Sequence, residues 1–126
     1  MKACVIPVGL LAAILGFSLW AGRYVEVRTD HWIALLETAD EAAAAENWRE
    51  AEAQLQGAYR DWEGSQTFFH TIMAHEGLDE AETLFVGAAA VCRERDDADF
   101  HLMLAQLTAQ LRLLAETQNG SIRNVL

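Results

Sequence analysis

The residues best suited to metal chemistry lie in one segment, FFHTIMAHEGLDEAE, residues 68–82. His75 and Glu76 begin like the zinc-protease pattern H-E-x-x-H, but Asp79 stands where that pattern needs its second histidine. On a continuous helix His70, five residues before His75, would point about 140° away from it. Structural zinc takes four protein ligands and catalytic zinc three. A metal-binding or hydrolytic domain centred on His70, His75, Glu76 and Asp79 is therefore the alternative interpretation.

The same segment also has the pattern of a joint between two helices. Gly77 interrupts the helical pattern, and Asp79 with Glu82 fits a capping box for a helix that starts there. Carboxylates near a helix amino end stabilise it by about 0.3–1 kcal/mol each. We favour this interpretation, and so expect no catalytic residue, no metal and no cofactor.

Nucleophilic catalysis has little support in the sequence. The serines lie in an apolar run (Ser18) or in turn-like contexts (Ser65 and Ser121). Cys92 could pair with His101, but no third group is evident to orient the histidine. We expect Cys4 and Cys92 to be separate, inert thiols, and His31 beside Asp30 to be a surface pair. The chain is predicted not to be an enzyme.

The amino-terminal run, residues 3–21, carries no charge over nineteen positions. As a helix it would be about 28 Å long, nearly the thickness of a hydrocarbon core. A cleaved signal peptide is the competing interpretation, but cleavage after Ala21 or Gly22 would place Leu19 or Trp20 where a small residue is required. We favour an uncleaved signal anchor, with residues 3–22 in the lipid bilayer and Trp20 and Tyr24 at its surface.

The charge distribution bears on partners and orientation. The chain has a formal net charge of −10, which excludes nucleic acid as an expected partner. Lys2 precedes the apolar run while Arg23 and Arg28 follow it, so the positive-inside signal nearly cancels. Because residues 29–126 carry a net charge of −12, we expect a single-pass protein of the cell membrane with its helical domain outside the cytoplasm. A freely secreted helical protein is a third possibility.

The remaining sequence predicts an all-α fold. The composition is rich in alanine, leucine and glutamate, and apolar residues recur at three- and four-residue spacing. Four helices are expected, the first continuing from the membrane segment. Asn47, with Glu50, should cap the second, which is expected to extend through Gly57 and Gly64 to about Met73. Asp96 or Asp97 should cap the last.

The short connections indicate that neighbouring helices run antiparallel. We therefore predict a single transmembrane helix (residues 1–23) followed by an antiparallel bundle of three to four helices (24–118). Gly120 is expected to end the last helix, and the tail (119–126) to pack on the bundle. The segment NWREAEAQLQGAYRDW has features of a tetratricopeptide helix, but no repeat follows at that period.

The order of these features resembles the bacterial DUF4363 family. An apolar amino-terminal segment is followed by NWREAEAQLQGAYRDW, HEGLDEAE, a turn near RERDDAD, a leucine-rich helix and a terminal SIRNVL. The resemblance covers nearly the whole chain, which departs from the family pattern at Gly77 and at the Gly120-containing link. It implies a small membrane-anchored protein and no known activity. The function expected is a membrane-tethered helical module that binds a protein partner of unknown identity.

Overall fold

A computed structural model describes the backbone of residues 2–72 and 75–125, and the side chains of residues 5–71 and 75–117. It contains five helices: α1 (Lys2–Ala44), α2 (Trp48–Gly64), α3 (Gln66–Ile72), α4 (His75–Glu94) and α5 (Asp97–Val125). The described residues include no strand. The all-α fold with one long apolar amino-terminal helix is confirmed.

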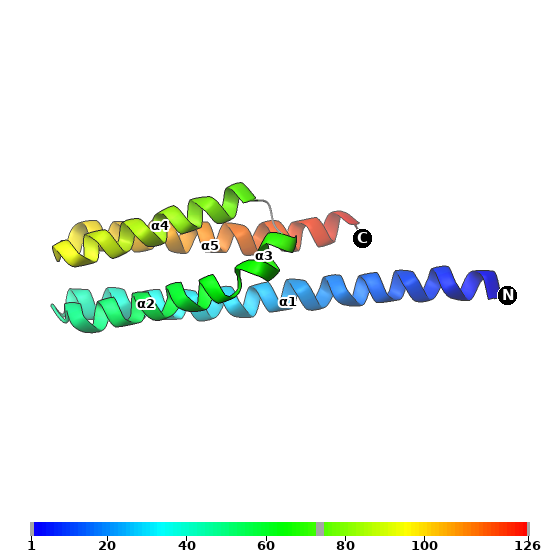
Figure 1. Ribbon diagram of the computed structural model, residues 1–126, viewed down its shortest axis with the longest axis horizontal. Coiled ribbons are helices and arrows are strands. Elements are labelled where there is room, and N and C mark those ends of the chain that lie inside the picture. Colours follow the sequence, from blue (N-terminus) through cyan, green and yellow to red (C-terminus); the bar gives the residue numbers. More distant parts are fainter. Residues whose placement is uncertain (1, 73–74, 126) are drawn as a thin grey trace.

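The four long helices form an up-down-up-down bundle (Figure 1). α1 packs against α2 and α5, and α4 packs against the same two helices. Each neighbouring pair is antiparallel, as the short connections predicted. The α1–α2 and α4–α5 turns lie at one end of the bundle (Figure 1). The amino-terminal part of α1 extends from the other end, and α3 lies near that end (Figure 1).

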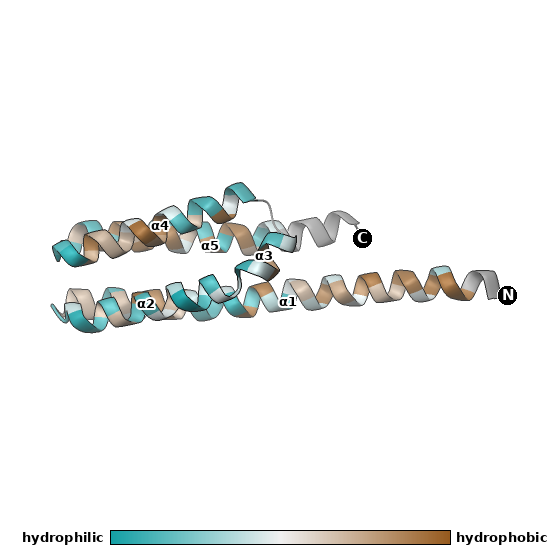
Figure 2. Cartoon of the chain, in the orientation of Figure 1, coloured by the Kyte–Doolittle hydropathy of each residue, from teal (hydrophilic) through white to brown (hydrophobic). Residues whose placement is uncertain are grey.

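α1 has two parts with different surroundings. Between Val5 and Trp20 all of its large apolar side chains except the partly buried Leu15 are exposed, from 52% at Ile14 to 74% at Ile6. From Ala21 onwards one face enters the core, where Val25 and Trp32 are almost fully buried. Figure 2 shows the apolar stretch along the part of α1 that projects from the bundle. The helix crosses this boundary without a break, so no flexible stalk separates the two parts.

Aromatic rings fill the centre of the bundle. Trp32, Trp62, Phe69, Phe85 and Phe100 are each no more than 2% exposed. Trp32 meets Phe69 edge to face with ring centroids 5.4 Å apart, and Trp62 lies 5.2 Å from Phe85. Such pairs add about 0.5–1.5 kcal/mol beyond the burial of their area. Trp32 and Trp62 thus contribute much of the core.

The α1–α2 and α4–α5 turns have the same backbone conformation and the same kind of helix cap. Glu46 and Arg95 adopt left-handed backbone conformations, with φ of 62° and 56°. Each is followed by a capping residue: Asn47 accepts a hydrogen bond from the Glu50 amide at 3.3 Å, and Asp96 accepts one from the Asp99 amide at 3.1 Å. Both helix starts were predicted. The Glu50 side chain, expected to reach back to Asn47, instead accepts from Gln54.

The prediction for the second helix was wrong beyond Gly64. α2 ends at Gly64, and Ser65 stands between it and α3. The Ser65 hydroxyl donates to the carbonyl of Asp61 at 3.1 Å, and its amide donates to Trp62. The turn re-aims the chain so that Phe69 enters the core. Met73, the predicted end of that helix, lies outside the described residues.

The other joints also differ from expectation. α4 begins at His75 and passes through Gly77, so Asp79 is inside the helix and the capping box predicted from Asp79 and Glu82 is wrong. Gly77 packs against α5 instead: a Cβ there would lie 2.5 Å from Cδ2 of Leu114. α5 continues to Val125, so Gly120 does not end it. The predicted packing of residues 119–126 concerns side chains outside the described set.

Candidate functional site

The structure brings His70 and His75 together. Nδ1 of His70, near the end of α3, lies 2.8 Å from Nδ1 of His75, the first residue of α4. The ring centroids are 4.8 Å apart and both side chains are exposed. The expectation that they point apart assumed one continuous helix. They meet because they belong to two helices on either side of a joint.

The other two candidate ligands do not form a metal-binding group with this pair. Glu76 and Asp79 are exposed on α4, where the carbonyl of Asp79 accepts a hydrogen bond from Thr83. Within the described part of the chain, no group of three or more His, Cys, Asp or Glu side chains is placed to hold a metal ion. The arrangement offers two imidazole nitrogens, with any further ligands to come from water or another molecule.

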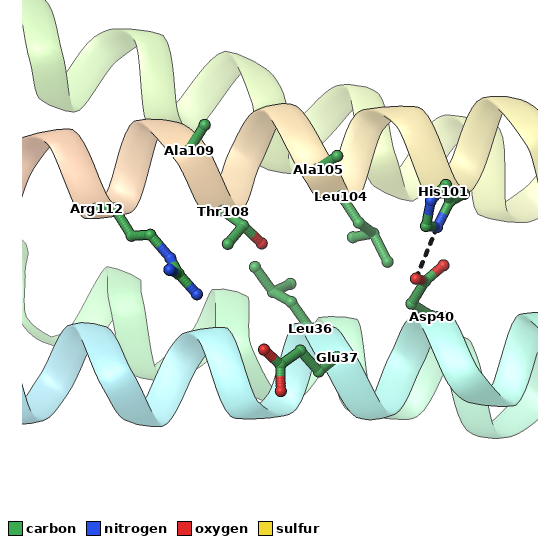
Figure 3. Close-up of a pocket in the computed structure, with 9 residues that line it drawn as sticks. All are labelled: Leu36, Glu37, Asp40, His101, Leu104, Ala105, Thr108, Ala109 and Arg112. Carbon is green, nitrogen blue, oxygen red and sulfur yellow. Dashed lines mark hydrogen bonds and ion pairs between the residues drawn. The ribbon is translucent and has the colours of Figure 1, made fainter.

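A groove of about 330 Å³ runs between α1 and α5 (Figure 3). Leu36 and Leu104 lie in its apolar floor with Ala105 and Ala109 beside them, as Figure 3 shows. Nδ1 of His101 donates to Oδ2 of Asp40 at 2.7 Å across one end, since a carboxylate can only accept. Glu37 and Arg112 also line the groove. The surface could receive an apolar group flanked by charges of either sign.

Cys92 and His101 do not form a catalytic pair. His101 is engaged with Asp40, and Cys92 is a free thiol buried to 4% exposure between helices. Burial raises the pKa of the Cys92 thiol, and the nearby Glu52 carboxylate adds to this effect. A thiol rather than a thiolate is a poor nucleophile. The expectation of a buried, unpaired Cys92 is confirmed; the side chain of Cys4 lies outside the described residues.

A second groove, of about 340 Å³, follows the seam between α2 and α4. Leu55, Phe85 and Val86 line it, and Val86 is 56% exposed. Beside it the Tyr59 hydroxyl donates to the Glu82 carboxylate, which joins the two helices. This hydrogen bond, followed by burial, raises the pKa of Tyr59 well above its usual range.

Sequence reasoning missed both grooves and both polar pairs that flank them. Asp40 and His101 are 61 residues apart, and Tyr59 and Glu82 are 23 apart. Each residue alone looks like a polar position on a helix. The signal that could have found them is the antiparallel register, in which Leu36 and Leu104 face each other one turn from Asp40 and His101. That register follows only once the neighbouring helices are known.

A comparison with protein families identifies the family of the chain. Residues 19–125 match the model of the family described as "Domain of unknown function (DUF4363)". No curated protein matches the chain, and no solved structure does. Because the family model covers most of the sequence, the chain belongs to the DUF4363 family, as its order of features indicated.

Proposed function

We propose that this member of the DUF4363 family is a non-enzymatic helical interaction module tethered to a bacterial membrane. The observation that carries the proposal is the exposed apolar part of α1. α1 is long and apolar enough to cross a membrane, and its side chains from Val5 to Trp20 contribute little to the core. A row of exposed apolar side chains this long needs an apolar partner, and a bilayer is the simplest one.

The tether is tested by extraction. Full-length protein in membranes should resist alkaline carbonate and should dissolve in detergent. The intact amino terminus, detected by mass spectrometry, separates an anchor from a cleaved signal peptide. Release by carbonate, or a mature chain that begins after residue 20, would end this part of the proposal.

The domain is proposed to face outward from the cytoplasm. Its support is the net charge of −12 over residues 29–126, together with the usual behaviour of amino-terminal anchors. Protease added to intact cells from which the wall has been removed should digest the bundle and leave the anchor. Protection of the bundle until the membrane is broken would reverse the orientation.

The proposed partner is another protein, bound on an apolar or acidic face of the bundle. The α1–α5 groove is one such face, because its floor is apolar. Ala105 and Ala109 line it and are exposed, and their small side chains do not cover that floor. A photo-crosslinking residue at Ala105 should give a discrete adduct in cells, whereas the same residue at exposed Ala53 on α2 should not. A protein that remains an isolated monomer and gives no adduct at position 105 would contradict an interaction role for this groove.

Metal binding at the α3–α4 joint is the second candidate, and the closeness of His70 and His75 favours it. Zn–N bonds are about 2.0–2.1 Å long. The 2.8 Å between the two Nδ1 atoms then corresponds to an N–metal–N angle of about 85°, which is smaller than the tetrahedral angle of zinc sites and suits adjacent ligands of a square-planar or tetragonal Cu²⁺ or Ni²⁺ site. Imidazole nitrogens suit zinc, copper and nickel. Hydrolysis would further require an activated water and a base, for which Glu76 is the nearest candidate in sequence.

Metal analysis separates the two candidates. Full-length protein in detergent should be equilibrated with Zn²⁺ or Ni²⁺, desalted and analysed for bound metal. Retention that is lost in His70→Ala and kept in His31→Ala would establish a site at the joint. Equal, negligible retention by all three proteins would remove this candidate and leave the interaction module.

A further inference from the structure

Three aromatic rings cluster where α1 changes from its exposed part to its packed part. The Trp20 ring lies 5.6 Å from that of Tyr24 and 5.7 Å from that of Phe68 on α3, measured between centroids. Tyr24 and Phe68 are 4.7 Å apart. Trp20 is 55% exposed, and Tyr24 and Phe68 are half-buried. We call this cluster the aromatic collar.

The helix that contributes Phe68 differs from its neighbours in charge. α3 has no Asp, Glu, Lys or Arg, and the charge-free run around it extends over residues 64–75. The other four helices all carry such residues, in a domain whose net charge is −12 from residue 29 onwards. A helix without formal charges can enter a lipid interface without the cost of dehydrating ions.

The geometry of α1 fixes where the membrane surface must fall. The uncharged run of residues 3–21 spans about 28 Å, close to the thickness of a hydrocarbon core. Trp20 is therefore at the outer boundary of that core. Tyr24 lies one turn, about 6 Å, further along the same helix, which is within the headgroup layer. Because α1 is continuous, Phe68 is held at this level too.

We propose that the aromatic collar and α3 lie in the lipid headgroup layer, so that the bundle rests directly on the bilayer. Tryptophan and tyrosine favour that layer, since their rings are apolar and their N–H and O–H groups bond with water and headgroups. The partner is an uncharged or zwitterionic lipid surface, because the acidic bundle would be repelled by an anionic one. This proposal rests on the proposed membrane tether.

Two threonines provide a matched pair for testing the position of α3. Thr71 on α3 and Thr83 on α4 are both exposed, and each hydroxyl donates to the carbonyl four residues earlier. Thr83 lies eight residues beyond His75, about 12 Å along α4 and away from the collar. Thr71→Cys and Thr83→Cys are made in full-length Cys4→Ser protein, and the buried Cys92 is left in place.

An environment-sensitive nitrobenzoxadiazole dye is attached to each cysteine, and the proteins are reconstituted into phosphatidylcholine vesicles. Either orientation places the bundle against a headgroup layer, so mixed insertion does not affect the comparison. The dye at position 71 should emit at shorter wavelength than the dye at 83. A nitroxide lipid labelled near its headgroup should quench the dye at 71 more strongly.

Two outcomes overturn the collar in distinguishable ways. If the proteins float with the vesicles but the two dyes emit alike and are quenched alike, the bundle stands away from the surface and the tether survives. If the proteins do not float with the vesicles, the tether itself fails and the collar fails with it.

Discussion

Asp61 on α2 accepts a hydrogen bond from the indole N–H of Trp32 on α1, with 2.6 Å between Oδ2 and Nε1. The same carboxylate also accepts a hydrogen bond from Arg28, whose Nη1 lies 3.1 Å from Oδ1. Arg28 is thereby held between Tyr24, whose ring centroid is 5.5 Å from its Cζ, and Asp61. Hydrogen bonding to Tyr24, followed by the Asp61 charge, raises the pKa of Arg28. One carboxylate thus joins the first two helices in the half of the bundle nearer the exposed apolar part of α1.

Replacement of Asp61 should destabilise the bundle. Asp61→Ala leaves the buried Trp32 indole N–H without a partner, and an unsatisfied buried donor costs about 1–3 kcal/mol. Thermal unfolding followed by circular dichroism in detergent should show a lower midpoint. Asp30→Ala, at an exposed position on α1, is the control and should change the midpoint little. Equal effects of the two substitutions would contradict the role of Asp61.

The Tyr59–Glu82 hydrogen bond should make the stability sensitive to alkali. Its effect is to raise the pKa of Tyr59 in the folded state above the unfolded value of about 10. The contribution of the Tyr59 hydroxyl to folding stability is therefore fully present below pH 10. It is lost as the pH rises above 10, because the unfolded chain then gives up the Tyr59 proton more readily than the folded one. Tyr59→Phe should cost about 1 kcal/mol at neutral pH, and the difference from the unmodified protein should shrink above pH 10.

Urea unfolding at pH 8 and pH 10.5 checks this expectation. The gap in unfolding free energy between the two proteins should be larger at pH 8. A gap that is the same at both values would mean that Tyr59 titrates alike in the folded and unfolded states. Because Phe retains the ring in its contact with Phe85, the comparison isolates the hydroxyl.

The helix starts could be predicted because their signals are local. Asn47 and Asp96 cap helices through contacts within three residues, so sequence spacing was sufficient. A joint within residues 68–82 was also predicted, and the separate helices α3 and α4 confirm it, but the start of α4 at His75 rather than at Asp79 was not predicted. Gly77 sits within α4 because its missing side chain makes room for Leu114, which is 37 positions away in the chain. A glycine selected for close packing and one that ends a helix look identical in a single sequence.

The geometry of the candidate site was mispredicted for a related reason. The angle between His70 and His75 was worked out for one helix, whereas the chain folds as two with a joint between them. The residue types were identified correctly and their geometry was not. The groove between α1 and α5 depends on which helices become neighbours, which no local pattern states.

Substitutions at two glycines should separate packing from helix propensity. Nothing lies within 4 Å of a Cβ added at Gly57, so Gly57→Ala should stabilise the bundle by about 1 kcal/mol. At Gly77 the same gain is opposed by the 2.5 Å contact with Leu114, so Gly77→Ala should stabilise less or destabilise. Urea unfolding of both variants measures the difference. The same stabilisation at both sites would show that Leu114 moves away at no cost.

Substitution by glycine should stabilise the protein at the two turn residues with left-handed backbone, whereas it destabilises at helix positions. Glu46 and Arg95 have φ near +60°, a conformation that costs an L-residue about 1 kcal/mol and costs glycine almost nothing. Each side chain is exposed, so its removal sacrifices little packing. Glu46→Gly and Arg95→Gly should each raise the unfolding free energy by up to about 1 kcal/mol.

The matched control for these turns is Glu41→Gly, at an exposed position inside α1. There glycine should lower the unfolding free energy by about 1 kcal/mol, since it adds flexibility to the unfolded chain and removes a helix-favouring residue. If the unfolding free energy rises for Glu46→Gly and falls for Glu41→Gly, the backbone at the α1–α2 turn is strained. Destabilisation at all three positions would show instead that Glu46 and Arg95 make stabilising side-chain contacts, and the turns would then be set by those contacts.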